Sequence, residues 1–203
     1  MTWFFPMTYD QLLALALFAF GTSITPGPNN LMLLASGANF GFWRTLPHML
    51  GVGMGFIALI VSIGVGLHNF LTLYPIAHYL LRIASICYLV YLAWKIGTSA
   101  PAQNPNASPK PLTFFQAAAF QWINPKGWAM AMTAIAVYAP DTSFAMIVLV
   151  ALIFGAINVP SVSAWALLGQ HIARFLQKPA HLRGFNLGMA ALILASLYTV
   201  ITA

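Results

Sequence analysis

Two short polar motifs inside apolar segments carry residue types that suit the binding of a small solute. The first is Thr25-Pro26-Gly27-Pro28-Asn29-Asn30, and the second is Asn124-Pro125-Lys126 with Gln121 just before it. Proline removes a backbone donor and clashes with the preceding turn, and glycine turns freely, so a helix should break at both motifs. Inside a membrane, a broken backbone survives only where protein or a watery cavity satisfies the freed groups. We interpret the motifs as walls of a site; the alternative is a proline kink that only shapes the bundle.

The polar groups of the two motifs suit the binding of an amino-acid zwitterion. Half-helix N-termini after Pro28 and Pro125 carry free N–H groups and partial positive charge, which favour a carboxylate. Placing the ammonium of Lys126 at mid-membrane costs about 3 kcal/mol or more, so it should be paired or face water. The alternative is that the side chain extends to the membrane surface, which is hard to do from the centre of a span. The predicted substrate-binding residues are Thr25, Pro26, Gly27, Pro28, Asn29, Asn30, Gln121, Asn124, Pro125 and Lys126.

Three further polar residues lie within the apolar segments, and the sequence leaves their roles open. His48 is either a proton carrier or an interfacial polar residue. Arg82 either lines the cavity or contacts carbonyls within the bundle. Asn158, two residues before Pro160, either extends the site or joins two helices.

Other kinds of site are not encoded. No His, Cys, Asp and Glu residues cluster with metal-ligand spacing, and no glycine-rich loop ends in Gly-Lys-Ser or Gly-Lys-Thr. The two acids, Asp10 and Asp141, form no catalytic pair. We therefore predict no metal, no cofactor and no enzyme activity.

The composition requires that these motifs sit in a membrane domain. The 203 residues are 61% hydrophobic and 5% charged, whereas a soluble domain carries about 25% charged residues. Long apolar runs indicate helices. The net charge of +6 arises because acids are scarce, and it suits the positive-inside bias of membrane proteins, not nucleic acid.

The fold class predicted is an all-α membrane protein with six spans, of which the first and fourth are broken. The six spans run about Tyr9–Phe40, Trp43–Leu67, Leu71–Ile96, Thr113–Tyr138, Ser143–Gly169 and Phe185–Ile201. The polar, proline-rich stretch 98–112 reads as a cytoplasmic linker. It divides one membrane domain into two three-helix repeats, 1–97 and 113–203.

The two halves echo one another. Ile24-Thr25-Pro26-Gly27 parallels Ile123-Asn124-Pro125-Lys126, 99 residues later. Three spans per half is an odd number, so the second half should enter the membrane from the opposite side. Inverted repeats whose interrupted helices meet near the midplane, with substrate at the broken ends, are typical of secondary transporters.

Charge predicts the orientation of the six spans. The first, third and fifth loops share one face of the membrane, and the other loops and both termini share the opposite face. The first face carries Arg44, Lys95, Lys110, Arg174, Lys178 and Arg183; the second carries only the two acids. The basic face should be cytoplasmic, with both termini outside.

Several stretches together resemble the LysE/RhtB family of amino-acid exporters, over nearly the whole chain. They are the Thr25–Asn30 motif, the glycine-rich second span, Tyr88–Ile96 and Phe120–Lys126. Asn29-Asn30, Ala93-Trp94-Lys95-Ile96 and Trp165-Ala166-Leu167-Leu168-Gly169 look most like the cysteine/O-acetylserine exporter branch. The resemblance implies export of amino acids across the bacterial inner membrane, proton linkage and homodimers.

One residue departs from the family pattern. Many members carry an aspartate after the second-span glycines, where this chain has Phe56 after Gly55. Coupling would then fall to His48, to Lys126 or to a proton on the substrate. The function predicted is export of small neutral amino acids or derivatives by alternating access. The alternatives are an uncoupled facilitator of small solutes and, in a different class, a membrane-embedded enzyme.

Overall fold

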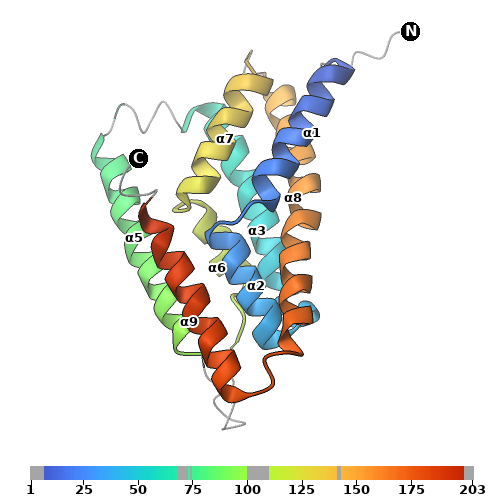
Figure 1. Cartoon of the computed structure of the whole chain (residues 1–203). Coiled ribbons are helices and arrows are strands. Elements are labelled where there is room, and N and C mark those ends of the chain that lie inside the picture. Colours follow the sequence, from blue (N-terminus) through green and yellow to red (C-terminus); the bar gives the residue numbers. More distant parts are fainter. Residues whose placement is uncertain (1–6, 68–72, 74, 100–109, 141–142, 199–203) are drawn as a thin grey trace.

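A computed structural model of the chain describes residues 7–67, 73, 75–99, 110–140 and 143–198. Within these ranges all regular elements are helices, which confirms the predicted all-α class (Figure 1). The first four are α1 (Tyr9–Ile24), α2 (Pro28–Phe40), α3 (Phe42–Ser62) and the π-helical turn η1 (Ile63–Leu67). The others are α5 (Pro75–Gly97), α6 (Phe114–Gln121), α7 (Pro125–Tyr138), α8 (Phe144–Ala173) and α9 (Pro179–Ala195).

Among the described residues, three helical stretches are by length and composition able to cross a membrane: Phe42–Leu67, Tyr79–Gly97 and Phe144–Ala173. The apolar helix Tyr9–Ile24 is shorter. A crossing needs about 20 residues, and α2 and α7 have 13 and 14. Each would therefore have to act with the short helix before it. The arrangement of six spans in two repeats stays a prediction.

Both predicted interruptions are present. The first separates α1 from α2 over Thr25, Pro26 and Gly27, and the second separates α6 from α7 over residues 122–124. Pro28 and Pro125 each occupy the first turn of the helix that follows. At that position the missing N–H would have no partner in any case, and the fixed φ of proline suits a helix.

Two predicted boundaries were wrong. The sixth predicted span began at Phe185, but α9 begins at Pro179, after Lys178 in an extended N-cap conformation. The predicted loop, Gln170–Gly184, is shorter because α8 runs on to Ala173. The basic residues of 170–184 had been assigned to a loop because of their charge. Exposed basic side chains are equally compatible with the first turns of a helix. Asp141, residues 68–72 and most of the predicted linker (100–109) lie outside the described residues.

Glycines let the helices that carry the site approach closely. A Cβ at Gly37 of α2 would lie 2.0 Å from the carbonyl oxygen of Ala166 in α8. On α3, a Cβ at Gly51 would lie 2.3 Å from the carbonyl oxygen of Phe114, and one at Gly55 would lie 2.6 Å from the Cα of Ala118. No side chain fits at these crossings, so α2 is held against α8 and α6 against α3.

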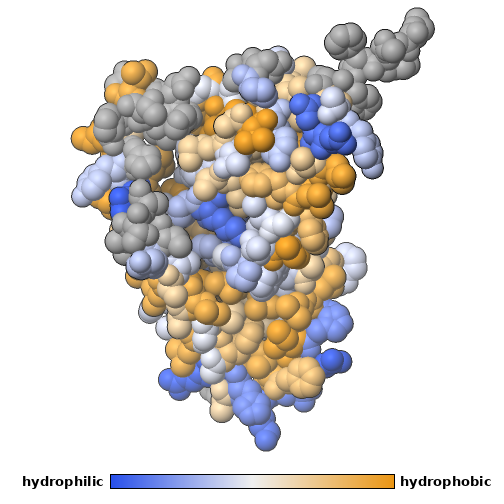
Figure 2. Space-filling view, turned by 45° about the horizontal axis from the view of Figure 1, so that its top comes forward, coloured by the Kyte–Doolittle hydropathy of each residue, from blue (hydrophilic) through white to orange (hydrophobic). Residues whose placement is uncertain are grey.

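The connections α2–α3 and α8–α9 lie at the lower end of the molecule in Figure 1, where α5 also ends. The start of α1 and the end of α7 lie at the upper end. In Figure 2 most of the coloured surface is apolar, and hydrophilic residues lie at the lower end, at the upper right and in the middle of the face. Exposed apolar side chains such as Leu17, Trp43 and Phe115 suit contact with lipid.

Candidate functional site

The two interruptions lie against each other. The Nζ of Lys126, at the start of α7, donates hydrogen bonds to the carbonyl oxygen of Thr25 at 2.8 Å, to its Oγ1 at 2.9 Å and to the carbonyl oxygen of Pro26 at 3.2 Å. A Cβ at Gly27 would lie 2.8 Å from the Cδ of Lys126, so glycine at that position lets the lysine pass. A cation from one interruption thus satisfies carbonyls that the other leaves free.

Other side chains close the remaining carbonyls at the end of α1. The Nδ2 of Asn30 donates to the carbonyl oxygens of Ser23 and Thr25, each at 2.7 Å. The Nε1 of Trp165, from α8, donates to the carbonyl oxygen of Ile24 at 3.1 Å. The last carbonyls of a helix need such partners. Together with Lys126 of α7, these partners come from three different helices, α2, α7 and α8. Asn30 therefore supports the shape of the first interruption.

The second interruption is tied to the first through a pair of amides. Asn29 Nδ2 donates to Gln121 Oε1 at 2.8 Å, and Gln121 Nε2 donates back to Asn29 Oδ1 at 3.1 Å. Trp128 Nε1 donates to the carbonyl oxygen of Trp122 at 2.8 Å. The hydroxyl of Ser85 in α5 donates to the carbonyl oxygen of Ile123. The start of α2 and the end of α6 are therefore linked directly.

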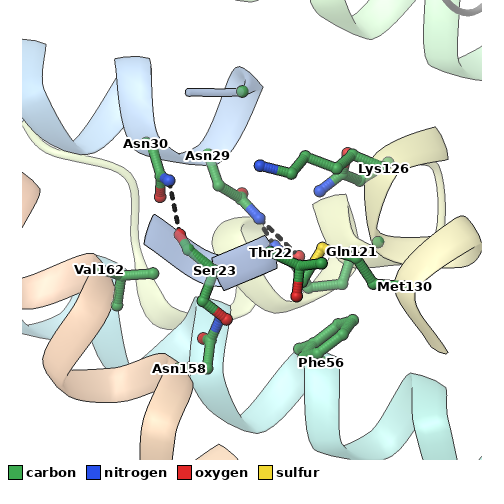
Figure 3. A pocket seen from close by; sticks show the side chains of 13 residues that line it. Thr22, Ser23, Asn29, Asn30, Phe56, Gln121, Lys126, Met130, Asn158 and Val162 are labelled. Atoms are coloured by element: carbon green, nitrogen blue, oxygen red, sulfur yellow. Dashed lines mark hydrogen bonds between the residues drawn. The ribbon is translucent and has the colours of Figure 1, made fainter. Parts of the chain in front are cut away.

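A cavity lies beside this junction (Figure 3). Its cavity volume is about 30 Å³, room for only one or two water molecules, and all empty space including its open mouth amounts to about 350 Å³. The wall is polar near the interruptions and apolar at Phe56, Met130 and Val162. The lining residues are Thr22, Ser23, Gly27, Asn29, Asn30, Phe56, Gln121, Asn124, Lys126, Gly127, Met130, Asn158 and Val162.

One side of the cavity is electropositive. Lys126 and Gly127 belong to the first turn of α7, whose N-cap residue Asn124 makes no capping hydrogen bond. The N–H groups of a first turn carry partial positive charge, and the ammonium of Lys126 adds a full charge. An anionic group of a ligand would be stabilised here.

Most of the predicted site residues come together. Gly27, Asn29, Asn30, Gln121, Asn124, Lys126 and Asn158 line the cavity. Thr25 and Pro26 offer backbone oxygens to the lysine, and Pro28 and Pro125 start the two helices behind them.

The structure does not place His48 or Arg82 among the lining residues. His48 is buried in α3, where neither ring nitrogen has a hydrogen-bond partner within the described residues. Arg82 lies on α5, which contributes no residue to the lining.

Six lining residues were not predicted. Thr22 and Ser23 directly precede the first interruption, and Gly127 and Met130 lie within one turn of Lys126, so helical spacing was a usable signal for these four. Phe56 had been singled out only as a departure from the family pattern. Val162 carries no signal in the sequence, because it reaches the cavity through the packing of α8. Within the described part of the chain, no group of His, Cys, Asp or Glu is arranged to hold a metal.

Comparison with known proteins identifies the family of the chain. The family model described as "LysE type translocator" matches residues 20–197. The "Cysteine/O-acetylserine efflux protein" of Escherichia coli O157:H7 is 31% identical over 191 residues, 93% of this chain and 96% of that protein. Proteins with the same name from Escherichia coli strain K12 and Shigella sonnei strain Ss046 are 30% identical, over 92% of this chain and 95% of theirs. The comparison with solved structures gave no match.

The resemblance read from the motifs is thereby confirmed. The matched region contains both interruptions and every residue that lines the cavity. Such a match implies a multi-pass protein of the inner membrane. The chain belongs to the family of LysE type translocators, and it is a transporter and not an enzyme.

Proposed function

We propose that this protein exports small neutral amino acids or their derivatives from the cytoplasm by alternating access. The observation that carries the proposal is the contact of Lys126 with the first interruption, beside a cavity that both halves of the chain line. The relatives named as cysteine/O-acetylserine efflux proteins support a small, uncharged side chain on the substrate.

The site accounts for both parts of such a substrate. Its carboxylate would bind at Lys126 and the start of α7, and it would displace the longest of the lysine's three contacts, to Pro26 at 3.2 Å. Its side chain would lie against the apolar wall at Phe56 and Met130. The cavity volume of about 30 Å³ is smaller than an amino acid, so the rest of the molecule would occupy the open mouth unless the cavity widens.

Counterflow in proteoliposomes tests the function. Vesicles preloaded with O-acetylserine, cysteine or serine should exchange these for labelled amino acid of the same class, and lysine and glutamate should exchange far less. Absence of exchange for every small neutral amino acid would refute the proposal.

The same vesicles test proton linkage, which the family resemblance implied. Lys126 is the one titratable side chain among the described residues that line the cavity. We propose that coupling passes through Lys126 or through the substrate itself. A pH gradient should then drive accumulation above the equilibrium level. Flux that only relaxes to equilibrium would make the protein an uncoupled facilitator.

Alternating access requires that one end be closed, and polar contacts join the helices at the basic end. Asn39 Nδ2 donates to Asn186 Oδ1 at 2.9 Å, and Asn186 Nδ2 donates back at 3.3 Å. Asn186 Nδ2 also donates to the carbonyl oxygen of Ser99 at 3.0 Å. These bonds connect α2, α9 and the end of α5. We propose that they close the cytoplasmic side, with both termini outside.

Asn186→Leu should open this end. Three hydrogen bonds are lost at about 0.5–1.5 kcal/mol each, so the inward-open population should rise roughly tenfold or more. In a Cys87→Ser background, a thiol placed at Thr22 would report the change: an impermeant reagent should label it several-fold faster in inside-out vesicles. Ser163→Ala is the control, since the hydrogen bond of that hydroxyl among the described residues, to the carbonyl oxygen of Val159, lies within α8. Unchanged labelling, or faster labelling only in intact cells, would contradict the gate or the orientation.

The homodimer stays a prediction.

A further inference from the structure

Two of the residues that line the cavity have a buried amide oxygen without a hydrogen-bond partner among the described residues. These oxygens are the Oδ1 atoms of Asn124, which precedes α7, and of Asn158, in α8. Both residues are buried, with 2% and 5% of their surfaces exposed, and both line the cavity. An unsatisfied buried acceptor costs free energy, so two of them in one cavity wall need an explanation.

Four amide donors in the same wall, those of Asn29, Asn30, Gln121 and Asn158, are already engaged. Asn29 and Gln121 exchange hydrogen bonds with each other, and the Asn30 amide donates to the end of α1. Asn158 Nδ2 donates to the hydroxyl of Ser23 at 3.1 Å. Spare acceptors with occupied donors call for a ligand group that only donates. A free metal ion would add uncompensated positive charge beside the ammonium of Lys126, whereas the ammonium of a zwitterion arrives with its own carboxylate.

We propose that the oxygens of Asn124 and Asn158 bind the α-ammonium group of the transported amino acid. The assignment rests on the proposed function and adds to it a basis for selecting amino acids over other small acids. An ammonium group has three donors and no acceptor, and its hydrogen bonds to the amides are strengthened by charge. Lys126 binds the carboxylate of the same molecule, so the site recognises both charged groups of the zwitterion.

The geometry gives this contact a mechanical consequence. Asn124 lies in the interruption between α6 and α7, and Asn158 lies on α8 next to Ser23 at the end of α1. An ammonium held by both amides would draw the second interruption toward α8 and the end of α1. Binding of substrate is thereby linked to the relative position of helices from both halves.

The test compares L-cysteine with 3-mercaptolactate, which carries a hydroxyl in place of the ammonium, under reducing conditions. Each compound competes for binding to purified wild-type protein and for cysteine counterflow. Sites that hydrogen-bond a substrate group reject analogues lacking it by large factors, so wild type should prefer cysteine by roughly 100-fold or more. In Asn158→Leu the preference should fall to a few-fold, and in Asn158→Asp, which keeps the acceptor, it should persist.

Two results would overturn the assignment: equal affinity of wild type for both compounds, or an unchanged preference in Asn158→Leu. The wild-type comparison needs no variant, so it decides the matter even where Asn158→Leu fails to fold. Exchange of cysteine without selectivity refutes the ammonium site alone. Absence of any amino-acid exchange by wild type refutes the proposed function as well.

Discussion

Lys126→Met should lower export by at least about 100-fold while most of the protein still reaches the membrane. Hydrogen bonds to a charged group contribute about 1.5–3 kcal/mol each. Loss of the ammonium removes both the proposed carboxylate partner and the contacts to Thr25 and Pro26. The carbonyl of Thr25 keeps a partner in Asn30, so the first interruption should survive. The measurement is counterflow per unit of folded protein, with membrane level determined on the same vesicles.

Lys95→Met is the matched control. Lys95 lies near the end of α5 and does not line the cavity, so the same loss of charge there should leave counterflow near the wild-type level. Lys126→Arg should also lose most activity, because a guanidinium is bulkier and Gly27 already lies close to the lysine stem. Export at the wild-type rate in Lys126→Met would remove the lysine from the site.

Gly55→Leu should have a large effect on folding. A Cβ at this position would lie 2.6 Å from the Cα and 2.7 Å from the carbonyl oxygen of Ala118, and 3.0 Å from the Cγ of Gln121. Backbone cannot yield as a side-chain tip can, so α6 would have to move away from α3. Overpacking of this kind costs about 1–3 kcal/mol and sometimes more. We expect a much lower amount of monodisperse protein in detergent, and loss of the Asn29–Gln121 pair in what remains.

Gly188→Leu provides the comparison for this variant. Gly188 lies in α9, where an added Cβ would have no neighbour within 4 Å among the described atoms. The same substitution should therefore leave the yield and the melting temperature nearly unchanged. Equal yields of the two variants would show that the α3–α6 contact is looser than described.

Much of the candidate site was predictable from local chemistry. Pro26-Gly27-Pro28 and Asn124-Pro125 each combine proline with a second residue that disfavours a continuous helix, so both interruptions could be predicted from these motifs. Proline alone is not enough, since Pro47 and Pro160 lie inside unbroken helices. A lysine among apolar residues must find partners, so Lys126 could be assigned to the site before its partners were known. The start of α9 was predicted too late because the basic residues before Phe185 were assigned to a loop. Pro179, at the first turn of α9, is the stronger signal for the start of a helix.

By itself, the sequence determined that the chain is helical, lies in a membrane and breaks at two places, since these follow from hydropathy and from the backbone of proline and glycine. Only the tertiary structure decided that the lysine of one break meets the carbonyls of the other. The same holds for Val162, which joins the cavity wall, and His48, which stays outside it. These outcomes depend on which helix faces cross, and crossings are set by backbone contacts at glycines such as Gly37 and Gly55. The spacing of residues along one helix does not predict which other helix packs against it.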